Sequence, residues 1–91
     1  MTDINATLVE RGNNYGDFDD NARTTEQMKL LFRRSPSWPE MQPYHHEALD
    51  MIAHKISRLL NGDPDFIDSW VDIAGYAQCA VNSIHKSQIE R

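Results

Sequence analysis

Cysteine is nearly missing from this sequence: Cys79 is the only one among 91 residues. A single cysteine excludes a disulfide within the chain and a cysteine-based zinc site. Long hydrophobic runs are missing too, since no segment approaches the ~20 apolar residues that a membrane span needs. The start of the chain shows no basic stretch followed by an apolar run, as a secretory signal would. We therefore expect a cytoplasmic protein, in the host cytoplasm if viral, that makes no membrane contact.

Positive charge is also scarce, with 9 Lys and Arg against 14 Asp and Glu and a net charge of −5. Proteins bind nucleic acid largely by neutralising phosphates with basic side chains, so this balance opposes direct nucleic-acid binding. The sequence contains no glycine-rich phosphate loop, no GxGxxG and no nucleophile motif. We therefore do not expect kinase or acyl-transfer chemistry.

Strand signals are missing as well: apolar and polar residues do not alternate, and no hairpin turn separates β-branched runs. Apolar residues instead recur at spacings of three and four, which predicts an all-α fold. The length allows one helical domain, residues 1–91. We expect three to four helices in a small bundle, with the last two forming an antiparallel pair at its centre. The expected helices are 4–11, ended by Gly12, then 17–34, 44–60, and a last one capped by Asp63 or Asp65 that runs to about Ser87.

Acidic residues recur at helical spacing on the last two expected helices. Glu47 and Asp50 share a face of the first, and Asp68 and Asp72 share a face of the second. Facing pairs of carboxylates form an oxygen-rich site of the kind that Mg²⁺ prefers. The alternative is a solvated face, because Asp68 and Asp72 point away from the apolar stripe of their own helix. A second copy would have to supply the opposite wall of a metal site, so this hypothesis requires a homo-oligomer.

Four other residues are candidates for ligand binding. Lys55 and Arg58 are three residues apart and can hold phosphate oxygens, although pairing with nearby acids explains them equally well. Tyr15, in "YGDF", either covers a pocket or precedes a turn at Gly16. Tyr76 is either a core-edge residue or a ligand contact, and Trp70 is expected to pack in the core. Gly75 within the last helix indicates close approach of another backbone, from a neighbouring helix or a second copy.

Three segments carry a resemblance to a known family: "YGDF", "EALDMIAHKISRLLNGDP" and "DSWVDIAGYA". In these the chain resembles a small family of phage-encoded domains without assigned function, over about residues 11–81. More distantly it is similar to nucleotide-modification-associated phage domains and to MazG-like all-α nucleotide pyrophosphatases. The latter resemblance implies Mg²⁺ ligands at Glu47, Asp50, Asp68 and Asp72, although the last two are spaced by four residues rather than three.

The resemblance implies a phage accessory protein that binds a nucleotide or related phosphate ligand. Mg²⁺-dependent nucleotide pyrophosphohydrolysis is one extension of this function, and whether the protein is an enzyme is left open. The alternative belongs to another class: a noncatalytic phage inhibitor that binds a host defence protein through its acidic surface.

Overall fold

The computed structural model describes residues 3–90 and contains helices only. No strand occurs within this range, which confirms the predicted all-α class. The elements are α1 (Ile4–Tyr15), α2 (Phe18–Arg33), the 3₁₀ helix η1 (Trp38–Glu40), α3 (Pro43–Asn61) and α4 (Ile67–Ile89).

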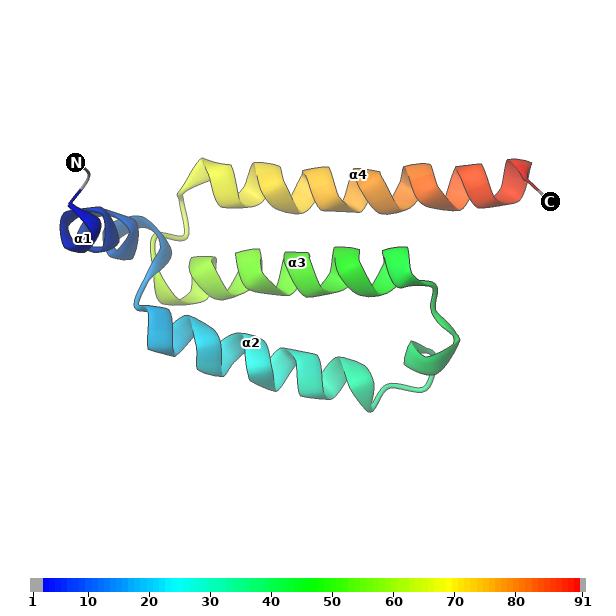
Figure 1. Ribbon diagram of the computed structural model, residues 1–91, viewed down its shortest axis with the longest axis horizontal. Helices are drawn as coiled ribbons and strands as arrows, with labels where there is room; N and C mark the ends of the chain where they lie inside the picture. The colour runs from blue at the N-terminus through cyan, green and yellow to red at the C-terminus, as the bar shows by residue number, and fades with distance from the viewer. Residues whose placement is uncertain (1–2, 91) are drawn as a thin grey trace.

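Three of the helices lie side by side in one layer, with α3 between α2 and α4 (Figure 1). The closest packing joins α3 to α4, as predicted for the last two helices, and α2 packs on the other side of α3. At one end of the layer α1 stands roughly perpendicular to the other helices, and it is seen nearly along its axis in Figure 1. Within residues 3–90, no helix combines the length and apolar character needed to cross a bilayer.

The central helix α3 follows the pattern predicted from its apolar periodicity. Gln42 and His45 form a capping box at its start, and Pro43 occupies the first turn, where its missing N–H costs nothing. The N–H of Gly62 donates to the Arg58 carbonyl at the other end. The helix therefore has a defined beginning and a defined end.

The first helix is longer than predicted. It continues through Gly12 and ends at Gly16, whose φ of 86° only glycine adopts readily. The prediction that Gly12 ends the helix is wrong, because glycine inside a helix costs only ~1 kcal/mol and does not by itself stop it. Asp17 then caps α2, accepting hydrogen bonds from the N–H groups of Asp19 and Asp20.

The last helix begins later than predicted and turns a different side to the core. Asp63 accepts a hydrogen bond from the Asp65 N–H in a turn, and α4 starts only at Ile67, without a side-chain cap. Its buried residue is Ser69, whereas Trp70 is 54% exposed and donates from Nε1 to the Pro64 carbonyl. The expectation that Trp70 packs in the core of the chain is wrong.

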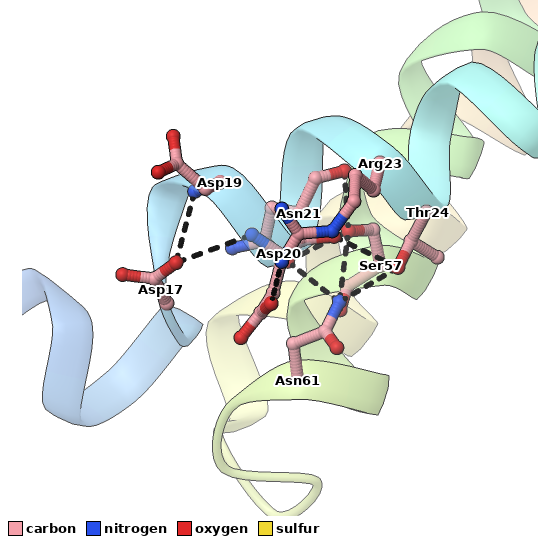
Figure 2. Close-up of polar contacts among 8 residues, drawn as sticks. All are labelled: Asp17, Asp19, Asp20, Asn21, Arg23, Thr24, Ser57 and Asn61. Carbon is pink, nitrogen blue, oxygen red and sulfur yellow. Dashed lines mark hydrogen bonds and ion pairs between the residues drawn. The ribbon is translucent and has the colours of Figure 1, made fainter.

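A polar network joins α2 to α3 at the end nearest α1 (Figure 2). The fully buried Ser57 donates to the Asn21 side-chain oxygen at 2.6 Å. Asn61 donates to the same oxygen at 3.2 Å and to the Thr24 hydroxyl at 3.1 Å. Asn21 in turn donates to the Tyr15 carbonyl at 2.7 Å. Because buried polar groups must be paired, this network fixes the relative register of α1, α2 and α3.

Candidate ligand-binding pocket

A pocket of about 520 Å³ lies where α1 crosses α2 and α3. Its size is in the range typical of small-molecule sites. The pocket is lined by Leu8, Arg11, Gly12, Tyr15, Gly16, Phe18, Asn21, Ala22, Thr25, His54 and Arg58.

Two glycines hold α1 across the layer at this position. A Cβ on Gly16 would overlap the Asn61 carbonyl, and a Cβ on Gly62 would lie 2.5 Å from the Tyr15 carbonyl carbon. The Asp63 N–H donates to the Asn14 carbonyl at 3.0 Å beside them. The α1–α2 corner and the α3–α4 corner thus touch backbone to backbone, and this contact forms one end of the pocket.

Tyr15 forms the centre of the cationic wall. The guanidinium carbon of Arg58 lies 4.7 Å from the centre of the Tyr15 ring, and that of Arg11 lies 5.5 Å from it. Phe66 meets the same ring edge-on, with 5.1 Å between ring centres. Arginine stacks favourably on aromatic rings, so Tyr15 holds both guanidinium groups at the pocket.

His54 adds a third nitrogen-bearing side chain to the pocket. Its Nε2 lies 3.0 Å from Lys29 Nζ, an arrangement in which a neutral imidazole accepts a hydrogen bond from the ammonium group. Burial lowers the pKa of His54, the charges of Lys29, Arg58 and Lys55 lower it further, and Asp50 opposes them. Positive charge therefore dominates the surroundings of this imidazole.

Three further residues make part of the pocket lining apolar. Leu8 comes from α1, and Phe18 and Ala22 come from the start of α2. The Phe18 side chain is 82% exposed, so most of its ring is free to meet a ligand. One ligand could thus place an anionic group against the arginines and a flat apolar group against Phe18.

The charge of the pocket is opposite to that of the whole protein. Among residues 3–90, none of those that line it is acidic, although the chain has a net charge of −5. Two arginines and a histidine gathered at one concave place in an acidic protein favour an anion there.

The structure brings together two of the four predicted ligand-binding residues. Tyr15 and Arg58 are in contact and both line the pocket. Lys55 points elsewhere: its Nζ lies 3.1 Å from Asp72 Oδ2, and so the alternative interpretation of Lys55 as an ion-pair partner describes its position. Tyr76 is half-buried on α4 and is not among the lining residues.

The four predicted metal ligands do not form a cluster within one chain. No three His, Cys, Asp or Glu side chains in the described range lie close enough to hold a metal ion. Asp72 is paired with Lys55, and Asp50 Oδ2 lies 3.7 Å from Arg33, while Glu47 and Asp68 are exposed. The four residues are therefore not gathered at one place in a single chain, and a metal site shared between two copies stays a prediction.

Sequence reasoning missed three residues of the pocket: Arg11, Phe18 and, as an anion contact, His54. A helical signal was present for two of them, since Arg11 precedes Tyr15 by four residues and His54 precedes Arg58 by four. The sequence could not show that α1 packs beside α3. This packing brings the pair Arg11 and Tyr15 together with the pair His54 and Arg58.

Comparison with known proteins gives a family but no function. No curated protein and no solved structure matches the chain. One family model matches residues 3–84, and its description is "Domain of unknown function (DUF6378)". The match covers both corners, the pocket and most of α4, so the chain belongs to the DUF6378 family.

Proposed function

We propose that the protein binds a nucleotide or a related phosphate ligand in the pocket beneath α1, as a phage accessory protein would. The observation that supports this most is the pair of arginines, Arg11 and Arg58, that line the pocket of an acidic chain. Guanidinium groups donate two parallel hydrogen bonds to phosphate oxygens, which makes arginine well suited to this ligand.

The apolar part of the lining favours a nucleotide over free phosphate. Phe18 offers an exposed ring beside the arginines, and stacking of a base on an aromatic ring is worth ~1–3 kcal/mol. Two different ends in one pocket match a ligand with a charged phosphate and a flat base. In this proposal Tyr15 positions Arg11 and Arg58, and these two side chains contact the phosphate.

Pyrophosphate hydrolysis has less support than binding. Within residues 3–90, Glu47, Asp50, Asp68 and Asp72 do not gather into a group of three or more ligands, and two of them pair with cations of their own. We therefore derive no catalytic step and propose binding alone.

The alternative of a noncatalytic inhibitor that binds a host protein through an acidic surface stays a prediction. The acids at the start of α2 are already used within the chain (Figure 2). Asp17 caps the helix, and Asp20 pairs with Arg23. No specific observation favours a basic partner at this place over solvent.

Thermal unfolding with a ligand panel tests the proposal. The panel contains nucleoside triphosphates, nucleoside monophosphates, the free nucleosides and inorganic phosphate, each with and without Mg²⁺. A ligand that binds only the folded state stabilises it by ~2.7 kcal/mol at about a hundredfold excess over Kd. We expect a rise in Tm with nucleotides, a smaller rise with phosphate, and none with nucleosides at the same concentration.

Matched arginine variants assign the effect to the pocket. Arg58→Gln and Arg11→Gln should abolish most of the ligand-induced rise. Arg23→Gln should keep it, because Arg23 lies on the exposed side of α2 and pairs with Asp20. A nucleotide effect that survives Arg58→Gln and Arg11→Gln would place the ligand elsewhere, and no effect from any phosphate compound would refute the proposal.

A further inference from the structure

The chain buries very little of its apolar surface. Within the described range, the buried apolar residues are Ala48, Ala53 and Leu59, two of which are alanines. Many larger apolar side chains are exposed instead, among them Leu31, Leu60, Trp70 and Val81. Burial of apolar surface is the dominant favourable contribution to folding, so this interior is too small for the length of the chain.

The reason lies in the architecture. The helices α2, α3 and α4 form a single layer (Figure 1), whereas stable domains are built from at least two packed layers. Only α1 projects from this layer, at one end and on the side where the pocket lies. The opposite side of the layer has no covering element among residues 3–90.

Helical geometry shows that this opposite side is the apolar one. Residues nine apart on a helix point in opposite directions, because nine steps of about 100° make two and a half turns. On α2, Leu31 is opposite the pocket residue Ala22, and on α3, Leu49 is opposite the pocket residue Arg58. On α4, Val81 is opposite Asp72, which pairs with Lys55. On α3, Lys55 lies about 60° from the pocket residue Arg58 and about 120° from Leu49.

The same geometry places Ile56, Leu60 and Trp70 beside these residues, since each lies about 160° from Arg58 or Asp72. We call this surface the apolar face; it consists of Leu31, Leu49, Ile56, Leu60, Trp70 and Val81. Leu31 and Leu60 are 66% and 70% exposed. This explains why Trp70 is exposed: α4 meets α3 along the side of Ser69, and the centre of its apolar stripe points out of the layer.

The amount of exposed surface matches what a dimer would bury. A compact monomer of 10.5 kDa is expected to expose about 5,400 Å², whereas this chain exposes 6,815 Å². The excess of roughly 1,400 Å² lies within the ~1,000–2,500 Å² that each chain of an obligate dimer buries. The radius of gyration of 15.6 Å likewise exceeds the ~12 Å expected of a compact chain of this length.

We infer that the apolar face is the interface of a homodimer, in which the second copy supplies the missing second layer. If burial of the apolar face is needed for the chain to be stable, this face must be covered in every molecule. Another copy of the same chain is the one partner that is present wherever the chain is made. Pairing of the same face on both chains gives a closed two-fold dimer, which does not extend into fibres.

This inference goes beyond the proposed ligand binding and does not depend on it. The dimer leaves the pocket open, because Arg58 is on the other side of α3 from Leu49. It also leaves Asp72 and Lys55 on the outer side, away from the second copy. In such a dimer the partner does not complete a metal site with Asp68 and Asp72.

Two neighbouring leucines of α2 make a matched test. Leu31 lies on the apolar face, and Leu30, also exposed, lies about 100° away from it. In sedimentation equilibrium at micromolar concentration, the wild type should have twice the 10.5 kDa mass of one chain. Leu30→Glu should keep that mass, whereas Leu31→Glu and Leu60→Glu should lose it, because each dimer would bury two charges.

The wild type should also melt about 4 °C higher for each tenfold rise in protein concentration, since unfolding of a dimer yields two chains. Unfolding of Leu60→Glu at all concentrations would support the interface as well, because glutamate at an exposed position does not unfold an isolated chain. A monomeric wild type with a concentration-independent Tm would overturn the inference. So would dimers that persist in both Leu31→Glu and Leu60→Glu.

Discussion

At the scale of single residues, the pocket is defined by side chains that hold one another in place. Tyr15 has Arg11 and Arg58 near its ring, and His54 accepts a hydrogen bond from Lys29. The two arginines have no carboxylate partner among the lining residues. Mutual repulsion of such groups costs stability, which is a cost that binding sites for anions commonly carry.

The titration of His54 follows from this arrangement. The pKa of His54 is lowered in the folded state, by burial and by Lys29 of α2 together with Arg58 and Lys55 of α3, while Asp50 acts in the opposite direction. The unfolded state therefore takes up the proton first as the pH falls. The contribution of His54 to stability is complete above its ordinary pKa of 6.5 and is lost as the pH falls through the lowered value.

We therefore predict that the Tm of the wild type falls between pH 7.5 and pH 5, and that His54→Gln shows a smaller fall. His85→Gln provides the control, because it also removes a histidine, but one that is exposed on α4 and does not line the pocket. Melting curves measured across this pH range in one buffer system give the change in Tm with pH for each variant. Equal slopes for His54→Gln and the wild type would contradict the assignment.

At the scale of elements, the two corners of the fold depend on glycine for different reasons. Gly16 needs a φ of 86° and has the Asn61 carbonyl against its Cα. Gly62 has a negative φ, and it is excluded from bearing a side chain only by the Tyr15 and Asn14 backbone. The contact between the corners fixes the position of α1 relative to α3, and therefore the shape of the pocket between them.

Alanine at either corner should destabilise the protein by more than about 1 kcal/mol, because a Cβ there meets backbone that cannot move aside easily. Gly75→Ala is the opposite case: no atom of the described chain lies within 4 Å of the added Cβ. Removing a glycine from the middle of α4 should stabilise it by up to ~1 kcal/mol. Urea unfolding of Gly16→Ala, Gly62→Ala and Gly75→Ala measures all three.

A loss of stability in Gly75→Ala would show that another chain approaches Gly75, as the sequence alone allowed. It would also count against the dimer inferred above, in which Gly75 lies away from the apolar face. A neutral effect of Gly62→Ala would show that the two corners are not in backbone contact.

The sequence predicted the elements better than it predicted their contacts. The apolar period of α3 is a local feature, and the helix forms over Pro43–Asn61, where 44–60 was expected. The helix expected over 17–34 likewise forms, as Phe18–Arg33. The side of α4 that meets α3 is not local, because the apolar stripe of this helix is wide enough to serve two neighbours. For this reason the prediction that Trp70 packs in the core is wrong, and its side chain is exposed.

At the scale of the whole molecule, the chain has two unlike faces. One side of the helical layer carries α1 and the cationic pocket, and the other carries the apolar face. The sequence predicted the helical class and indicated Tyr15 and Arg58 as candidate ligand-binding residues. Arg11, Phe18 and His54 line the same pocket only because of where α1 lies relative to the layer. The position of α1 is set by the backbone contact between the two corners. This contact joins residues far apart in the sequence and cannot be predicted from local sequence patterns.

The most direct test of the ligand pocket is a nuclear magnetic resonance titration of the ¹⁵N-labelled protein with a nucleoside triphosphate and Mg²⁺. The account predicts that the amide signals of Gly12, Tyr15, Gly16 and Arg58 shift together and saturate, while those of Asp68 and Asp72 stay in place. Shifts that begin at Asp68 and Asp72 would instead locate the ligand at the acidic side of α4, and an unchanged spectrum would refute phosphate-ligand binding.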